Sequence, residues 1–302
     1  MTDRTRVGTR RSRLARQQTG LVLAALARAA PGRRFDAVPI DTSGDRDLSP
    51  GGSPDFTDAI DRALLRGDVD LAVHSAKDLP ATLDARLALW ACPRRADPHD
   101  CLIAAPGRTA HRLPRGARVG SSSPRRRAQL HRWRPDLRWV EIRGNVDTRL
   151  DRLRTGELDA VVLAVAGLAR LGRSGEVGRV LPERAFLPAP AQGALAVVGR
   201  VDDRASEAVA RRIDHATTHA CVVAERAFSA AIGGDCQVPL GALASVQGPR
   251  LTLVGEVLSP SGNRSLRLKG EGRVSEAAGV GAALAERMLE RGWPVGAGPH
   301  PR

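Results

Sequence analysis

Apolar and polar positions follow two different periods along the first two-thirds of the chain. Between residues 12 and 30, apolar side chains such as Leu14 and Val22 recur on one side of a helical repeat, which predicts an amphipathic helix. Residues 35–40 alternate as a half-buried strand does, and the short, mostly apolar run at 69–73 resembles a buried strand. Short strands that alternate with helices predict an α/β domain.

A further helix is predicted just before the strand at 69–73. Ser53 is a residue type that favours the N-cap position, and Pro54 suits the first helical position after it. Phe56 and Ile60 then follow four residues apart and form the start of an apolar stripe. Gly67 would end this helix.

A second unit repeats the same logic. Its predicted elements are a strand at 117–122, a helix capped by Ser123 and Pro124, a strand at 138–142, a helix at 146–155, a strand at 159–165 and a helical turn through Arg170. The Pro-rich and then apolar segment at 187–198 resembles a return connection between units.

The pattern changes near His215. One helix is predicted to about Ile232, followed by strand-like runs at 251–257 and 265–272 and a last amphipathic helix at 275–291. This order is typical of a small α+β domain with an antiparallel sheet.

The sequence therefore predicts two α/β lobes and a small C-terminal α+β domain. We place the first lobe at 1–94 and 194–211, the second at 95–193 and the C-terminal domain at 212–302. Ligands of such lobes bind at the carboxyl ends of the strands, often in the cleft between lobes.

Charge narrows the choice of partner. The chain has 47 Lys and Arg against 33 Asp and Glu, a formal net charge of +14, which favours an anionic partner unless the basic surface is merely solvated. With 3% aromatic residues, no Tyr and no recognisable nucleic-acid motif, little is available to stack on bases. We therefore expect no nucleic acid, and composition leaves an acidic membrane face and a small polycarboxylate open as partners.

Other compositional features point to the cytoplasm. No apolar run is as long as a membrane span, and the hydrophilic, arginine-rich start has no secretory apolar segment. The four cysteines form no CxxC pair, which is typical of a protein in a reducing compartment. We expect a cytoplasmic protein that does not bind membranes.

Arginines recur beside hydroxyl or small residues at the ends of predicted strands. Helix N-termini and arginine side chains both bind carboxylates and phosphates, so these turns are candidate anion sites, although each alone could be a solvated loop. The residues concerned are Arg10 and Ser12 in TRRS, Ser123, Arg125 and Arg126 in GSSSPRRR, and Arg143 and Arg149 in IRGNVDTR.

Two further side chains are candidates for chemistry. Asp78 follows a buried strand and could stabilise a transient cation, or simply pair with Lys77. Cys236 lies on a glycine-rich turn after a helix and could be an accessible nucleophile or covalent anchor, although most cysteines are packing residues. His215 and His219 are four apart but lack a third ligand, so we expect no metal.

Taken together, several segments resemble the hydroxymethylbilane synthase (porphobilinogen deaminase) family over nearly the whole chain. The segments that carry the resemblance are VGTRRSRLARQQT, DTSGD, VDLAVHSAKDLP, VGSSSPRRRAQL, IRGNVDTRLDRL, AVAGLARLG, LPAPAQGAL and AERAFSAAIGGDCQVPLGA. The resemblance implies two periplasmic-binding-protein-like α/β lobes with a cleft between them, plus the small C-terminal domain.

The resemblance also implies a reaction. Cys236 would carry a dipyrromethane cofactor through a thioether, and four molecules of porphobilinogen would be condensed head to tail on it. Each porphobilinogen loses ammonia to give a cationic azafulvene, and water finally releases the linear hydroxymethylbilane. Asp78 matches the family's catalytic aspartate, and the protein is expected to be a monomer that serves porphyrin biosynthesis.

Further positions of this chain match residues that the family uses for binding. For the cofactor they are Lys77, Asp78, Ser123, Arg125, Arg126, Arg149 and Gly193, together with Cys236. For the substrate they are Arg10, Ser12, Arg143, Arg149 and Arg170.

The chain departs from the family pattern in places. The loop GGSPDFTDAI at 51–60 stands where the family usually has a sequence like GGKGLFTKEL, and Ala191 and Asp235 stand where glycine is usual. Two alternatives to an active synthase remain: a divergent paralogue, and a non-catalytic anion- or pyrrole-binding protein on the same scaffold.

Overall fold

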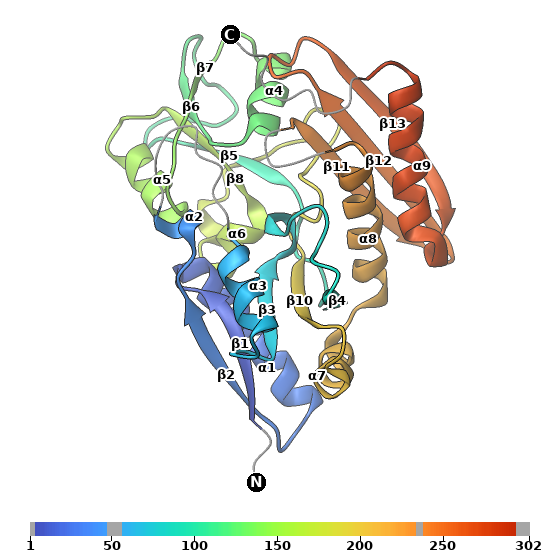
Figure 1. Cartoon of the computed structure of the whole chain (residues 1–302). Coiled ribbons are helices and arrows are strands. Elements are labelled where there is room, and N and C mark those ends of the chain that lie inside the picture. The colour runs from blue at the N-terminus through green and yellow to red at the C-terminus, as the bar shows by residue number, and fades with distance from the viewer. Residues whose placement is uncertain (1–3, 47–55, 234–237, 294–302) are drawn as a thin grey trace. The chain divides into compact units, whose positions relative to one another are not determined.

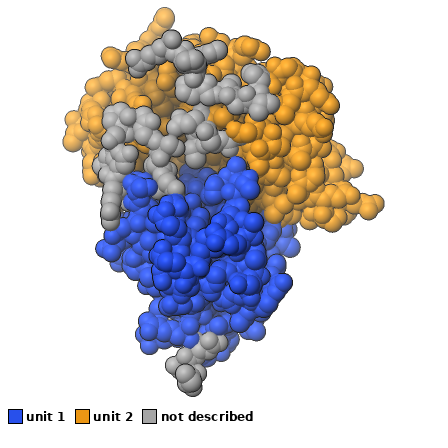
Figure 2. All heavy atoms as spheres, viewed as in Figure 1, with its two compact units in different colours: residues 1–96, 193–219 blue, residues 97–192, 220–302 orange. Residues whose placement is uncertain are grey.

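The computed structural model describes residues 4–46, 56–233 and 238–293 of the chain. It divides into two compact units (Figure 2). Unit 1 comprises residues 1–96 and 193–219, and unit 2 comprises residues 97–192 and 220–302.

Unit 1 is built on a five-stranded mixed sheet (Figure 1). In their order across the sheet, its strands are β2 (Arg34–Ile40), β1 (Arg4–Arg10), β3 (Leu71–Ser75), β10 (Leu195–Arg200) and β4 (Leu87–Ala91). β1 is parallel to β2 and β3, whereas β10 is antiparallel to β3 and β4. Its other elements are α1 (Arg13–Ala29), α2 (Ser43–Arg46), α3 (Asp58–Leu65), η1 (Ala76–Asp78), α7 (Arg204–Ala210) and η3 (Arg211–Ile213).

Burial on both faces of the sheet holds unit 1 together. Val22 and Leu26 of α1 pack with Val7 and Leu71 of the sheet in one apolar cluster. α3 contacts β1 and β3 as well, and its Ile60 is fully buried. Because both faces are covered, β3 is largely apolar, with Leu71, Ala72 and Val73 buried, as the strands of covered sheets usually are.

Unit 2 contains a second five-stranded sheet. In order across it, the strands are β7 (Arg138–Val140), β6 (Arg118–Gly120), β8 (Ala160–Ala164), β5 (Asp100–Ala104) and β9 (Arg179–Val180). β7, β6 and β8 are parallel, and β5 runs antiparallel to β8. The helical elements here are α4 (Pro124–Trp133), α5 (Val146–Arg154), α6 (Val165–Arg170) and η2 (Ser174–Glu176).

The C-terminal part of unit 2 is an antiparallel three-stranded sheet with two helices packed on it (Figure 1). Its elements are α8 (Ala216–Ala231), which begins in unit 1, then β11 (Leu240–Gln247), β12 (Arg250–Leu258), β13 (Ser265–Arg273), η4 (Val274–Glu276) and α9 (Ala277–Glu290). Phe228 and Leu284, from the two helices, lie in its core. Two side chains of α4, Arg132 and Gln129, donate hydrogen bonds to the carboxylate of Glu256 on β12, at 2.7 and 3.2 Å.

The predicted fold class is confirmed: each unit contains an α/β sheet, and a small α+β portion follows. The structure adds β4, β5 and β11, which the hydrophobic pattern did not predict. The division into three domains at 94/95, 193/194 and 211/212 stays a prediction. Among the described residues, none of the helices combines the length and apolarity needed to span a bilayer.

One predicted helix start was wrong. Ser53 and Pro54 lie outside the described residues, and the helix begins later, at Asp58, with Thr57 as its N-cap residue. Asp58 and Asp61 lie in the first turn, where negative charge interacts favourably with the helix dipole. Phe56 therefore precedes the helix instead of belonging to its apolar stripe.

Candidate functional site

In unit 1, two parallel strands bring candidate residues to one edge of the sheet. β1 ends at Arg10, and β3 ends at Ser75, directly before the η1 turn that carries Lys77 and Asp78. Nη1 of Arg10 lies 3.8 Å from Oδ2 of Asp78, and both side chains remain partly accessible, at 20% and 28%. Lys77 is exposed. The structure thus brings Arg10 and Asp78 together at this edge of the sheet, and their roles stay predictions.

Hydrogen bonds from α1 fix these strand ends. Ser12 is the N-cap of α1, and its side chain accepts a hydrogen bond from the backbone N–H of Ala15. On the next turns, Gln18 donates to the Ser75 hydroxyl at 2.8 Å, and Thr19 donates to the Thr9 hydroxyl at 2.7 Å. The last residues of β1 and β3 are therefore tied to the same helix.

Two further side chains lie near Arg10. Neither of them was selected as a site residue from the sequence. The Arg10 guanidinium carbon lies 3.9 Å from the centre of the Phe56 ring, a cation–π contact. His74, on β3, is almost fully buried, and its Nε2 lies 4.0 Å from Oδ1 of Asp61 on α3. Burial, with a contribution from the charge of Arg10, lowers the pKa of His74 to about 4, so its imidazole is neutral at physiological pH.

In unit 2, the carboxyl ends of β6, β7 and β8 meet at one edge of the sheet. Ser123 caps α4 after β6, and Asn145 caps α5 after β7, each by accepting from a backbone N–H of the first turn. Both caps place helix N-termini at the strand ends. The candidate residues on or next to these loops are Ser123, Arg125, Arg126, Arg143, Arg149 and Arg170.

Arg125 and Arg126 are both buried and share one carboxylate. Asp100, at the start of β5, is fully buried, and its two oxygens lie 2.8 Å from Nη1 of Arg125 and 2.7 Å from Nη2 of Arg126. Arg125 also donates to the Leu187 carbonyl at 2.7 Å, and Gln192 donates to Asp100 at 2.9 Å. These contacts give both arginines a fixed orientation.

Arg149 brings another positive charge to this edge. Its Nε donates to the Gly144 carbonyl and its Nη2 to the Ser122 hydroxyl, both at 2.9 Å. Burial, together with the charges of Arg126 and Arg143, lowers the pKa of Arg149 to about 10. An anion bound here would relieve this repulsion.

A strained turn leads from unit 2 back to unit 1. Ala191 has φ of 60°, in the left-handed region that favours glycine, and its N–H donates to the buried carboxylate of Glu225 at 2.5 Å. Gly193 follows with φ of 86°, and its carbonyl accepts from Ala96 at 3.0 Å. The departure from glycine at Ala191 thus falls on a position where an L-residue is strained.

The described thiols do not supply a covalent anchor. Cys92, Cys101 and Cys221 are all buried, and burial raises the pKa of Cys101 to about 12. Cys236 and its neighbour Asp235 lie outside the described residues.

The two histidines singled out in the sequence have local partners. The Nδ1 of His215 accepts from the N–H of Thr218 at 3.2 Å, at the start of α8, and His219 contacts Asp214 at 2.9 Å. Within residues 4–46, 56–233 and 238–293, no three His, Cys, Asp or Glu side chains are grouped so as to hold a metal.

Comparison with known families identifies the chain. The model of "Porphobilinogen deaminase, dipyromethane cofactor binding domain" matches residues 5–208, and that of "Porphobilinogen deaminase, C-terminal domain" matches residues 219–290. The chain belongs to the porphobilinogen deaminase family.

Curated relatives agree with this assignment. A porphobilinogen deaminase of Roseiflexus sp. (strain RS-1) is 46% identical over 291 residues, covering 95% of this chain and 96% of that protein. One from Pelotomaculum thermopropionicum is 44% identical, covering 95% and 93%. Among solved structures, a Salmonella typhimurium periplasmic binding protein with high arginine specificity matches at 12% identity and a TM-score of 0.42, covering 69% of this chain and 90% of that one, too weakly to carry an argument.

The arginine-rich edge of unit 2 suits the cofactor of the porphobilinogen deaminase family. Dipyrromethane carries carboxylate side chains, and the buried guanidinium groups of Arg125 and Arg126 share the single carboxylate of Asp100. The buried Nε–H of Arg125 also donates no hydrogen bond within the described part of the chain. Surplus positive charge and a spare buried donor both fit a carboxylate ligand.

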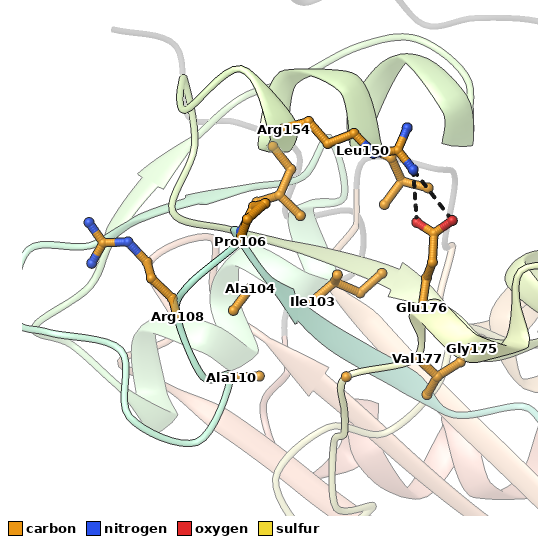
Figure 3. A pocket seen from close by; sticks show the side chains of 12 residues that line it. Ile103, Ala104, Pro106, Arg108, Ala110, Leu150, Arg154, Gly175, Glu176 and Val177 are labelled. Atoms are coloured by element: carbon orange, nitrogen blue, oxygen red, sulfur yellow. Dashed lines mark hydrogen bonds and ion pairs between the residues drawn. The ribbon is translucent and has the colours of Figure 1, made fainter.

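A separate hollow in unit 2 does not involve the predicted site residues (Figure 3). It has a volume of about 340 Å³ and is lined by Ala104, Leu150 and Glu176, among others. Ala104 pairs with Ala160, which places the hollow at the amino end of β8. Its rim charge Arg154 is paired with Glu176. The candidate residues that follow β6, β7 and β8 lie at the opposite ends of these strands.

Sequence reasoning missed Asp100, His74 and Phe56. Asp100 opens β5, a strand that the hydrophobic pattern did not predict, and nothing in its local sequence signals that two distant arginines converge on it. His74 did lie in the HSAKDLP segment that carries the family resemblance, but no partner for it was evident from spacing.

Proposed function

We propose that this chain is a hydroxymethylbilane synthase. It condenses four porphobilinogen molecules head to tail on a covalently bound dipyrromethane, releases ammonia at each step and finally releases the linear tetrapyrrole. The observation that carries the proposal is the partly accessible Asp78 carboxylate beside Arg10, at the carboxyl ends of adjacent parallel strands.

Asp78 is the catalytic residue in this proposal. It accepts hydrogen bonds from pyrrole N–H groups and stabilises the cation that forms when porphobilinogen loses ammonia. A fixed anion beside a developing cation lowers the barrier most when it is partly shielded from water, and Asp78 is 28% exposed. Nη1 of Arg10, 3.8 Å away, is the nearby counter-charge of this carboxylate.

Arginines and hydroxyl groups hold the carboxylates of the substrate and cofactor. Each added pyrrole brings an acetate and a propionate, which suits several separate guanidinium groups better than one. We assign substrate binding to Arg10, Ser12, Arg143, Arg149 and Arg170. We assign cofactor binding to Lys77, Asp78, Ser123, Arg125, Arg126, Arg149 and Gly193.

Cys236 is the proposed anchor of dipyrromethane through a thioether. When bound, this group supplies the pyrrole α-carbon to which the first substrate unit is joined. The support from this chain is indirect: the described cysteines are buried, whereas Cys236 lies in the glycine-rich segment that matches the family.

We further propose a cytoplasmic monomer that acts on porphobilinogen and binds neither nucleic acid nor membranes. The basic residues of the candidate site are spread over strand ends in two units, and two of them, Arg125 and Arg126, are buried in ion pairs. A nucleic-acid surface would present such residues on an accessible face.

Substitution of Asp78 tests the proposal. We expect Asp78→Asn to keep the fold and to lower the rate of ammonia release from porphobilinogen by at least a hundredfold, because a charge contribution of several kcal/mol is removed. Asp84→Asn is the matched control, since Asp84 is an exposed carboxylate of the same unit that pairs with Arg86. Ammonia release by Asp78→Asn at the rate of this control would refute the assignment.

A further inference from the structure

Asp100 is a buried carboxylate that contacts both arginines at the first turn of α4. Its side chain is fully buried, and its Oδ1 accepts from Nε and Nη2 of Arg126, at 3.1 and 2.7 Å, and from Nε2 of Gln192 at 2.9 Å. Its Oδ2 lies 2.8 Å from Nη1 of Arg125. A single side chain of β5 therefore sets the position of two guanidinium groups.

The two arginines differ in their other contacts. Nη1 of Arg125 also donates to the Gln129 side chain and to the Leu187 carbonyl, at 2.9 and 2.7 Å. Arg126 donates to the Val162 carbonyl at 3.1 Å, at the middle of β8. Arg126 also donates to the Gln192 side chain, at 3.5 Å. It donates two hydrogen bonds to Asp100, whereas Arg125 approaches Asp100 through Nη1 alone, so the orientation of Arg126 depends more strongly on Asp100.

The contacts of both arginines with Asp100 depend on the negative charge of its carboxylate. Burial by itself would raise the pKa of Asp100, but the charges of Arg125 and Arg126 and the Gln192 amide hold it far below its usual range. Asp100 is therefore ionised at neutral pH. Two arginines against one carboxylate still leave a net positive charge at this edge of the sheet.

We propose that Asp100 is a positioning residue, which orients the Arg126 guanidinium for carboxylate binding without touching the ligand itself. The inference rests on the proposed function, since it concerns how the arginines of that site are held. A guanidinium binds a carboxylate through a planar fork, so its affinity depends on orientation as well as charge.

The first test is Asp100→Asn, which keeps the size of the side chain and removes its charge. Its matched control is Asp159→Asn, because Asp159 also contacts two arginines, Arg108 and Arg118, but lies at the amino end of β8. Both variants are expected to unfold at lower temperature than wild type. Proteins from a host that makes porphobilinogen are compared by intact mass and by turnover.

The proposal predicts that only Asp100→Asn lowers the fraction of chains that carry the cofactor adduct. In the loaded chains, KM for porphobilinogen should rise tenfold or more while kcat changes less than threefold, because a misoriented Arg126 no longer helps to bind the carboxylates that each porphobilinogen brings beside the cofactor. Asp159→Asn should keep both the wild-type loading and the wild-type KM.

A purely structural role predicts a different result. If Asp100→Asn matches Asp159→Asn in loading and KM, with only the unfolding temperature lowered, the inference is wrong and the proposed function stands. A wild-type chain with neither adduct nor turnover would overturn the proposed function and this inference with it.

A milder variant decides the question if Asp100→Asn does not accumulate as folded protein. Gln192→Met removes the amide that donates to Asp100 and to the Pro98 carbonyl and that accepts from Arg126 at 3.5 Å, and it leaves both ion pairs of Asp100 in place. It should raise KM severalfold in the same direction. A wild-type KM and wild-type loading in this variant would contradict the positioning role.

Discussion

At the scale of single residues, His74 links burial to acid stability. Its imidazole is buried on β3, and burial lowers its pKa from 6.5 to about 4. Between these two values the unfolded chain binds a proton that the folded chain does not, so the free energy of unfolding falls as the pH decreases through this window. Above pH 6.5 neither state carries this proton and the full stability is present.

We predict that His74→Gln flattens this part of the stability profile. Wild type should lose roughly 3 kcal/mol of unfolding free energy through His74 between pH 6.5 and 4, since one pKa unit corresponds to about 1.4 kcal/mol. Urea unfolding at a series of pH values measures the effect. His111→Gln, at an exposed position, should retain the wild-type slope. Equal slopes for wild type and His74→Gln would show that His74 does not titrate as described.

The contacts of the candidate site residues were only partly predictable from the sequence. Arg10 and Asp78 were expected at strand ends, and the structure brings them within 3.8 Å. The sharing of Asp100 by Arg125 and Arg126 was not predictable, because the partners lie on different elements and meet only after the sheet forms. Local sequence indicates which side chains can bind an anion, but not which buried group orients them.

At the scale of elements, capping side chains determine where the site helices begin. Asn145 accepts from the Thr148 N–H at 2.9 Å and from the Thr148 hydroxyl at 3.1 Å, which fixes the first turn of α5. That helix carries Arg149, so the cap also helps to hold a candidate binding residue.

We predict that Asn145→Ala lowers the free energy of unfolding by about 1 kcal/mol, because an N-terminal N–H of α5 loses its acceptor. Asn145→Asp should stay close to wild type, since aspartate is an equally good cap. Urea unfolding of the three proteins measures the difference. An aspartate variant as unstable as the alanine variant would indicate that capping is not the contribution of Asn145.

The predicted helix boundaries agree with the structure where a capping residue marks them. Ser123 and Pro124 open α4 as expected, and Gly67 follows the end of α3 with positive φ. The pair Ser53 and Pro54 predicted too early a start for α3. The helix begins after Thr57, and acidic residues occupy its first turn. The added strand β5 is antiparallel and short, so its apolar run had no periodicity to distinguish it.

At the scale of the whole molecule, the proposed binding of a small polycarboxylate accounts for the net charge of +14. Arg125 and Arg126 share the single carboxylate of Asp100, so part of the basic surplus is buried, and the arginines at the strand ends of each unit match a polycarboxylate better than a long polyanion. The order of strands and helices in the sequence was enough to predict two α/β lobes. The assignment of residues 220–302 to the same compact unit as the second lobe depends on contacts such as Arg132 with Glu256, which no local pattern indicates.

The central claim is that this chain carries dipyrromethane on Cys236, and intact-mass measurement of the purified protein tests it most directly. From a host that makes porphobilinogen, wild type should show a covalent adduct of the mass of dipyrromethane. Cys236→Ala should lack the adduct, and the control Cys221→Ala, at a buried cysteine of α8, should retain it. An unmodified wild-type mass, or an adduct that persists in Cys236→Ala, would contradict the account.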